Sequence, residues 1–95
     1  MAEKVCFVTG SGRRIGASII RKFSNEGYAV LIHVASSVEA GEALKDQLID
    51  KGARADVLQA DLSSKQETIQ LISAIENHPF VQQRGGLDVL LHNAS

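Results

Sequence analysis

The fold of this chain is indicated most directly by an apolar run that ends at a glycine-rich turn and leads into a helical repeat. The run covers residues 4–9 (KVCFVT), and Gly10, Gly12 and Gly16 follow it. Its β-branched residues are typical of a buried strand, and the apolar residues after Arg14 recur at helical spacing. Backbone N–H groups at the start of such a helix bind phosphate, and glycine lets the backbone approach it closely. The turn therefore predicts a nucleotide-binding strand–turn–helix unit, with a purely structural glycine turn as the alternative.

Strand and helix patterns alternate along the rest of the sequence. The apolar runs predict strands over residues 4–9, 28–35, 53–60 and 87–93. The helical spacings predict helices over residues 14–27, 36–52 and 64–78, and residues 80–86 are expected to form a polar connector. Such alternation produces a parallel sheet with right-handed crossovers. We therefore predict an α/β fold: the N-terminal β-α-β-α-β-α-β portion of a Rossmann-like, doubly wound parallel sheet, with residues 1–95 as the cofactor-binding part of one domain.

Local patterns mark where the helices begin and which residues recur along them. Ser36 with Glu39, and Ser64 with Glu67, have the spacing of capping boxes at the starts of the second and third helices. The recurring apolar residues are Ile15, Ile19, Ile20 and Phe23 in the first helix and Ile69, Ile72 and Ile75 in the third.

Composition limits the class of protein and its partners. The 95 residues are 44% hydrophobic but only 4% aromatic, which predicts an aliphatic core in one small domain. A net charge of −1 argues against nucleic acid or an anionic membrane as a partner. The single cysteine, Cys6, excludes an internal disulfide and is expected to be a buried, inert thiol of a cytoplasmic protein. No apolar run reaches the ~18 residues of a membrane span, and no spacing suggests a metal site.

The motifs resemble those of the short-chain dehydrogenase/reductase family. The family's first motif, Thr-Gly-x-x-x-Gly-x-Gly, is similar to TGSGRRIG, in which Thr9, Gly10 and Gly16 match and Arg14 replaces the middle glycine. That replacement resembles the pteridine reductase branch, as does LIHVASS at the end of the second strand. The final LHNAS is similar to the family's Asn-Asn-Ala-Gly motif as found in bacterial dihydromonapterin (dihydrofolate-type) reductases. ADL resembles the segment that receives the adenine after the third strand.

This resemblance implies an NADPH site at one edge of the sheet. The cofactor-binding residues it implies, together with the turn, are Gly10, Gly12, Arg13, Arg14, Ile15, Gly16, His33, Ser36, Ser37, Asp61, Leu62, Asn93, Ala94 and Ser95. Arg14 and Ser95 are also expected near the substrate. Two of these residues have structural alternatives, since His33 could be a hydrogen-bonded core residue and Asp61 a helix cap.

The end of the second strand bears on the choice of cofactor. NAD-binding proteins hold the ribose hydroxyls with an acidic residue at this point. The equivalent position here is expected at Val34, but no Asp or Glu occurs between Tyr28 and Val38. Arg13, with the hydroxyls of Ser36 and Ser37, is suited to the 2′-phosphate instead, which favours NADPH over NADH. Alternatively, Ser36 caps the second helix and the arginines are simply solvated.

The chain lacks the pair that does the family's proton transfer, Tyr-x-x-x-Lys. The single tyrosine, Tyr28, is followed four residues later by Ile32, so no catalytic residue is expected here. For the complete enzyme, the resemblance implies hydride transfer from NADPH to a pteridine (dihydropterin or dihydrofolate-like) substrate. The alternatives are a short-chain reductase acting on a ketone, such as a ketoacyl reductase, or a non-catalytic nucleotide-binding module.

The last strand makes the chain look incomplete as a folding unit. If that strand packs beside the first, residues 89–91 form a bare apolar edge, which favours aggregation. We therefore expect the C-terminal half of the same protein, as a separate chain or a further segment, to dock there. The resemblance implies a homotetramer for the complete enzyme.

Overall fold

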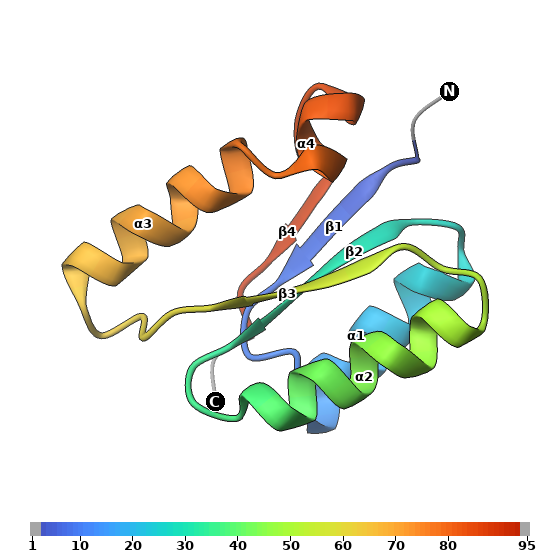
Figure 1. The fold of residues 1–95 in the computed structure, drawn as a ribbon, viewed down its shortest axis with the longest axis horizontal. Helices are drawn as coiled ribbons and strands as arrows, with labels where there is room; N and C mark the ends of the chain where they lie inside the picture. Colours follow the sequence, from blue (N-terminus) through green and yellow to red (C-terminus); the bar gives the residue numbers. More distant parts are fainter. Residues whose placement is uncertain (1–2, 94–95) are drawn as a thin grey trace.

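The computed structural model describes residues 3–93, which form one parallel sheet with helices on both faces (Figure 1). The strands are β1 (Val5–Val8), β2 (Ala29–Val34), β3 (Ala55–Gln59) and β4 (Val89–Leu91). The helices are α1 (Arg14–Asn25), α2 (Val38–Asp50), α3 (Lys65–Glu76) and α4 (Pro79–Arg84). The strand order is β3-β2-β1-β4 and every pairing is parallel. This arrangement confirms the predicted Rossmann-like fold.

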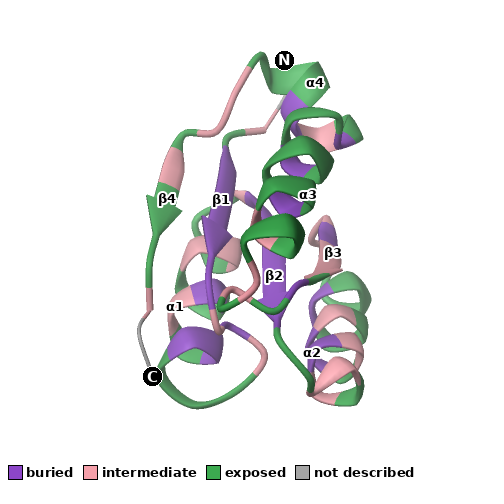
Figure 2. Ribbon diagram, turned by 90° about the vertical axis from the view of Figure 1, so that its left-hand side faces the viewer, coloured by how far each residue is buried: buried purple, intermediate pink, exposed green. Residues whose placement is uncertain are grey.

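The two central strands carry the core on both of their faces (Figure 2). Because side chains alternate along a strand, Val5 and Phe7 pack toward α3 and α4, whereas Cys6 and Val8 pack toward α1 and α2. Cys6 is fully buried, and this burial raises the pKa of its thiol to about 11. The prediction of a buried cysteine is confirmed.

The third helix was predicted from three isoleucines, but only one of them is buried. Leu71 and Ile75 pack on the sheet, whereas Ile69 and Ile72 are 57% and 52% exposed. A helix turns about 100° per residue, so residues spaced by three drift around its surface, and spacing by four keeps Leu71 and Ile75 together. The apolar periodicity therefore located the helix but not the face that it buries.

The polar connector predicted over residues 80–86 is wrong, because its first part is the short helix α4. Pro79 occupies the first helical turn, where its missing N–H costs nothing. The buried His78 caps the helix by accepting the N–H of Phe80 at its Nδ1, 3.1 Å away. Gly85 ends the helix in the left-handed conformation, with φ of 89°.

The two predicted capping boxes differ in outcome. Ser64 Oγ accepts the N–H of Glu67 at the start of α3, as expected, although the Glu67 carboxylate bonds to the Asp61 N–H instead of reaching back to Ser64. The box at Ser36 does not form, because α2 begins one residue later, with Ser37 at the cap position and no capping bond from its side chain.

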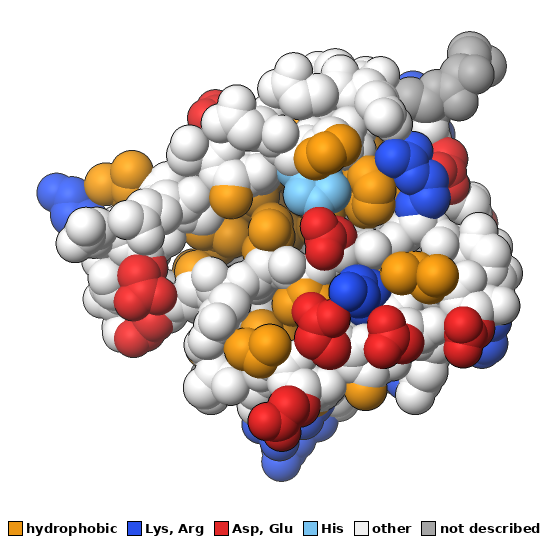
Figure 3. Space-filling model, in the orientation of Figure 1, with side chains coloured by type: hydrophobic (Ala, Val, Ile, Leu, Met, Phe, Trp, Pro, Cys, Tyr) orange, Lys and Arg blue, Asp and Glu red, His pale blue; other side chains and the backbone are white. Residues whose placement is uncertain are grey.

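The face covered by α3 and α4 contains a surface hollow. A hollow of about 190 Å³ lies between α3 and β3, with apolar side chains visible on its floor (Figure 3). Leu58 and Leu71 line it beside the polar side chains of Gln59 and Gln70. No helix within residues 3–93 is both long and apolar enough to cross a membrane.

Candidate functional site

A cleft of about 610 Å³ opens at the carboxyl ends of the strands, beside the start of α1. Its lining residues are Gly10, Gly12, Arg13, Arg14, Ile15, His33, Val34, Ala35, Ser36, Ser37 and Asn93. All of these except Val34 and Ala35 are among the cofactor-binding residues predicted from the sequence. In open parallel sheets, ligands bind at this edge, beside the point where the strand order reverses.

The glycines of the turn are required by close contacts. A Cβ on Gly16 would lie 2.7 Å from Ser11 Cα and 2.8 Å from Asn93 Nδ2, so α1 could not approach the strand ends. A Cβ on Gly12 would lie 2.7 Å from a methyl group of Val34. Gly16 itself is buried and does not line the cleft, so it acts by letting the helix pack closely.

Arg14 adopts a backbone conformation that favours glycine. Its φ of 58° is positive, and it is the single non-glycine residue for which this holds within residues 3–93. In L-residues this left-handed conformation brings Cβ close to the backbone, and glycine avoids that cost. The arginine therefore stands at a position where the backbone geometry alone would select glycine.

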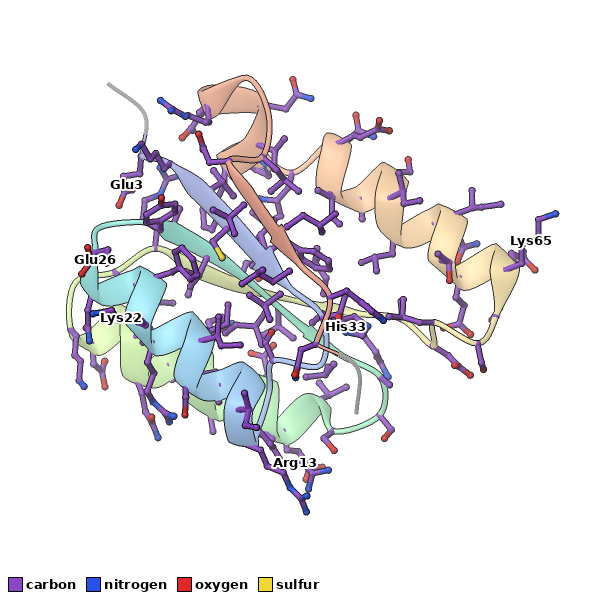
Figure 4. All side chains as sticks on the ribbon, turned by 180° about the vertical axis from the view of Figure 1, so that it is seen from behind. Glu3, Arg13, Lys22, Glu26, His33 and Lys65 are labelled. Carbon is purple, nitrogen blue, oxygen red and sulfur yellow. The ribbon has the colours of Figure 1, made fainter. Side chains whose placement is uncertain are left out.

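Positive charge gathers at the mouth of the cleft. Arg13 and Arg14 are exposed, and no salt bridge joins either of them to a carboxylate in the described part of the chain. The first turn of α1 contains no acidic residue. Figure 4 shows Arg13 projecting outward from the start of α1. The positive end of the helix dipole adds to these charges, so the mouth of the cleft is suited to an anion.

The cofactor-selecting position at the end of β2 was predicted at Val34, whose side chain is buried in the structure. The Val34 side chain is 3% exposed and packs beneath the glycine turn, against Gly12 and Gly41. Ala35 is the first exposed residue after the strand. Neither position carries an acid, and none of the described residues that line the cleft is acidic.

The end of β4 is fastened to the glycine turn by Thr9. The Thr9 hydroxyl accepts the N–H of Asn93 at 2.9 Å and lies 3.0 Å from His92 Nδ1. Asn93 Nδ2 donates to the Gly10 carbonyl at 3.2 Å. These bonds place Asn93 at the cleft, whereas the predicted contacts of Ala94 and Ser95 lie outside the described residues.

The turn between β3 and α3 does not line the cleft. Asp61 Oδ1 accepts hydrogen bonds from the Ser63 hydroxyl and the Ser63 N–H, which lower the pKa of the Asp61 carboxyl. Leu62 packs against the core beneath α3. Asp61 and Leu62 therefore do not lie with the arginines at the cleft, and their contacts with the adenine stay a prediction.

His33 is buried at the inner wall of the cleft, and both of its ring nitrogens are engaged by the protein. Nδ1 accepts the Gly10 N–H, and Nε2 bonds the Ala60 carbonyl, each at 2.9 Å. Ser11, which sequence reasoning missed, is fully buried beside it and donates its hydroxyl to the Val8 carbonyl. A small polar residue directly after a strand-ending glycine is the signal that could have pointed to Ser11.

Comparison with known families agrees with this geometry. Residues 4–95 match the family model described as short chain dehydrogenase. The chain belongs to the short-chain dehydrogenase family. The glycine turn and the Thr9–Asn93 connection both lie within the matched residues.

Two curated relatives in the family are reductases. Elsinochrome reductase 1 of Elsinoe fawcettii is 37% identical over 91 residues, which cover 96% of this chain and 32% of that protein. The 3-oxoacyl-(acyl-carrier-protein) reductase of Staphylococcus aureus is 36% identical over 91 residues, which cover 96% of this chain and 35% of that protein. This chain thus spans about a third of the length of these relatives.

Solved short-chain dehydrogenase structures superpose on the chain. A metagenomic short-chain oxidoreductase in complex with NADP has a TM-score of 0.85 at 29% identity, covering 99% of this chain and 40% of that one. FolM alternative dihydrofolate reductase 1 from Brucella canis, complexed with NADP, has a TM-score of 0.74 at 32% identity, covering 97% and 35% respectively.

Proposed function

We propose that this chain is the dinucleotide-binding part of an NADPH-dependent short-chain reductase. The observation that carries the proposal is the pair of arginines without carboxylate partners in the described chain, at the mouth of a cleft with no acidic lining residue. A 2′-phosphate is stabilised by such charges, whereas the ribose hydroxyls of NADH favour a carboxylate. The NADP complexes of the two superposed structures support this choice.

The described residues fit the cofactor in shape and charge. The glycine turn lets the backbone approach a pyrophosphate, and the N–H groups at the start of α1 precede the first helical hydrogen bond, from Ala17 N to the Arg13 carbonyl. Arg13, with Ser36 and Ser37, would hold the 2′-phosphate, and Arg14 the pyrophosphate and substrate. When bound, NADPH supplies the hydride for reduction of the substrate. The residues of this chain bind and orient it.

We propose a pteridine, of the dihydropterin or dihydrofolate type, as the substrate of the complete enzyme. Arg14 in the place of a glycine and the final HNAS support this proposal, as does the similarity to the Brucella alternative dihydrofolate reductase. The second candidate is reduction of a ketone, favoured by the similarity to the 3-oxoacyl reductase. Activity of the full-length protein with NADPH on dihydrofolate and dihydrobiopterin, against acetoacetyl thioesters, distinguishes the two. Activity on the thioester alone would contradict the pteridine assignment.

The length of the relatives suggests what completes the enzyme. We propose that the remaining two-thirds of a relative's length, the C-terminal part of the same protein, packs along the free edge of β4 and carries the proton-transfer residues. A cytoplasmic location and a homotetramer remain expectations from composition and from the family resemblance. The non-catalytic module would be favoured if the full-length protein bound NADPH but lacked a Tyr-x-x-x-Lys pair.

Replacement of Arg13 tests the cofactor assignment. We expect the full-length protein to bind NADPH more tightly than NADH, and Arg13→Ala to weaken NADPH binding while leaving NADH binding nearly unchanged. Loss of a charge-assisted hydrogen bond costs about 1.5–3 kcal/mol of binding free energy, which is roughly 10- to 150-fold in affinity. Because Arg13 is exposed, we expect a loss of affinity at or below the lower end of this range. Fluorescence titration with each cofactor measures this.

The matched control for Arg13→Ala is Arg21→Ala, since Arg21 lies further along α1 and bonds Gln47 of α2. That variant should bind both cofactors like the unmodified protein. Equal affinity of the unmodified protein for NADPH and NADH would contradict the assignment.

A further inference from the structure

His33 connects three segments at the edge of the sheet where the cleft opens. Its ring Nδ1 faces the Gly10 N–H, and its Nε2 faces the Ala60 carbonyl at the end of β3, each 2.9 Å away. Its own N–H donates to Ser11 Oγ at 2.9 Å, and its carbonyl accepts the Ser11 N–H at 2.9 Å. The residue thus bonds the glycine turn through both its side chain and its backbone.

The partners of the ring determine its protonation pattern. A backbone N–H can only donate and a backbone carbonyl can only accept, so Nδ1 must be the bare acceptor and Nε2 must carry the proton. His33 is 2% exposed, and its ring packs in an edge-on arrangement with that of Phe7, with 6.2 Å between the ring centroids. Burial on this scale leaves the imidazole little contact with a ligand in the cleft.

We infer that His33 is a positioning residue that fixes the phosphate-binding turn, and that cofactor affinity depends on the Gly10 N–H···Nδ1 bond. The inference rests on the proposed function of the cleft. Gly10 is the pivot of the turn, because its φ of 60° sets the direction in which the chain leaves β1, and its carbonyl holds Asn93. Without an acceptor at Nδ1, the N–H of the half-buried Gly10 has no partner there, and the turn must shift for this N–H to reach water.

Three substitutions at His33 separate positioning from stability. Asparagine places an amide oxygen near the position of Nδ1, so His33→Asn keeps the acceptor for Gly10 and loses the bond to Ala60. Glutamine reaches the position of Nε2, so His33→Gln keeps a donor for Ala60. His33→Leu removes both polar atoms and leaves an apolar side chain of comparable size.

The test is NADPH titration of the full-length protein and these variants, together with their thermal melting. We expect His33→Leu and His33→Gln to lose about three- to tenfold in NADPH affinity, the range for one lost hydrogen bond. His33→Asn should bind within about twofold of the unmodified protein even though the smaller side chain lowers its melting temperature. Adenosine 2′-phosphate, which has no pyrophosphate, should bind all four proteins alike.

The matched control is His78, a second buried histidine at the start of α4. Its Nδ1 also accepts a backbone N–H, and its Nε2 lies 2.7 Å from Asp56 Oδ2. His78→Leu should lower the melting temperature without changing NADPH affinity. Unchanged affinity in His33→Leu, or an equal loss in His33→Asn and His33→Leu, would overturn the inference. If the unmodified protein bound neither NADPH nor NADH, the proposed function itself would fail.

Discussion

Arg14 combines an unfavourable backbone conformation with a side chain suited to an anion. With a φ of 58°, a non-glycine residue destabilises the fold by about 1–2 kcal/mol relative to a relaxed backbone. Glycine avoids this strain but loses more conformational entropy on folding, which offsets about 0.5–1 kcal/mol of the gain. We therefore expect Arg14→Gly to raise the free energy of unfolding by about 0.5–1 kcal/mol and to weaken NADPH binding. Denaturant unfolding and cofactor titration of the full-length protein measure both effects.

Arg14→Ala is the control, because alanine removes the guanidinium but keeps the strained backbone. It should weaken NADPH binding as much as glycine does and bring no gain in stability. A glycine variant that is less stable than the unmodified protein, or that binds NADPH equally well, would show that the arginine contributes to the fold and not to the ligand.

The sequence predicted the location of a residue well where a motif places it, and poorly where contacts with residues distant in the sequence determine its position. Gly10, Gly12, both arginines and Asn93 were predicted at the cleft and line it, whereas Gly16 was predicted there but lies beneath it. The cofactor-selecting position at the end of β2 was assigned to Val34, which lines the cleft but packs its side chain against Gly12 and Gly41. The sequence did not indicate this packing, because the direction of a side chain at a strand end depends on its neighbours. The bond from His33 to Ala60 joins residues 27 positions apart and leaves no local pattern.

At the scale of elements, Asp88 ties α4 and β4 to β1. Its carboxylate accepts hydrogen bonds from Arg84 Nη2 at 2.9 Å and from the Val5 N–H at 2.8 Å. The Arg84 guanidinium, and then the Val5 N–H, hold the pKa of this carboxyl below the usual aspartate value. A group whose pKa is lowered on folding stabilises the fold above the unfolded-state value of about 3.9, and that contribution is lost as the pH falls below it.

We therefore expect Asp88→Asn to lower the melting temperature at pH 7, with a difference from the unmodified protein that shrinks as the pH is lowered from 5 toward 2. Thermal melting of the full-length protein across this range measures the effect. Asp50→Asn, at an exposed position on α2, is the control and should show no comparable dependence on pH. A constant difference at all pH values would contradict the role given to the Asp88 charge.

Element boundaries were predictable where glycine or proline marks them. Gly27 and Gly52 follow α1 and α2 in the left-handed conformation, and α3 ends before Pro79, all as the pattern indicated. The helix α4 was missed because an imidazole provides its cap, and histidine is not among the residues that usually signal a helix start.

At the scale of the whole molecule, the order of strands follows from general rules, whereas the extent of the core does not. Short right-handed crossovers between parallel strands leave few arrangements for this alternation, and the observed sheet is the expected one. How far each strand is buried depends on which helices and neighbouring strands pack against it. β2 is fully buried, but Leu90, which pairs with Phe7 on the face of α3 and α4, is 65% exposed.

The exposed edge at β4 leads to a prediction about residues 1–95 expressed alone. Within residues 3–93, β4 has a neighbouring strand on one side only, and Leu90 and Leu91 on β4 are 65% and 37% exposed. An apolar edge strand with free backbone groups pairs readily with another chain. Ile72 on α3, 52% exposed, adds apolar surface to the molecule. We expect residues 1–95 to self-associate and to lack a cooperative monomeric melting transition.

Sedimentation velocity over a range of concentrations, together with thermal melting, tests this expectation. Leu90→Lys places a charge on the edge strand, where charges oppose pairing between sheets, and should shift the distribution toward monomer. Ile49→Lys is the matched control, because Ile49 is 47% exposed on α2, on the opposite face of the sheet, and should leave association unchanged. Residues 1–95 sedimenting as a monomer at all concentrations, with one cooperative transition, would show that the half-covered sheet is stable by itself. In that case the free edge of β4 would need no further segment to cover it.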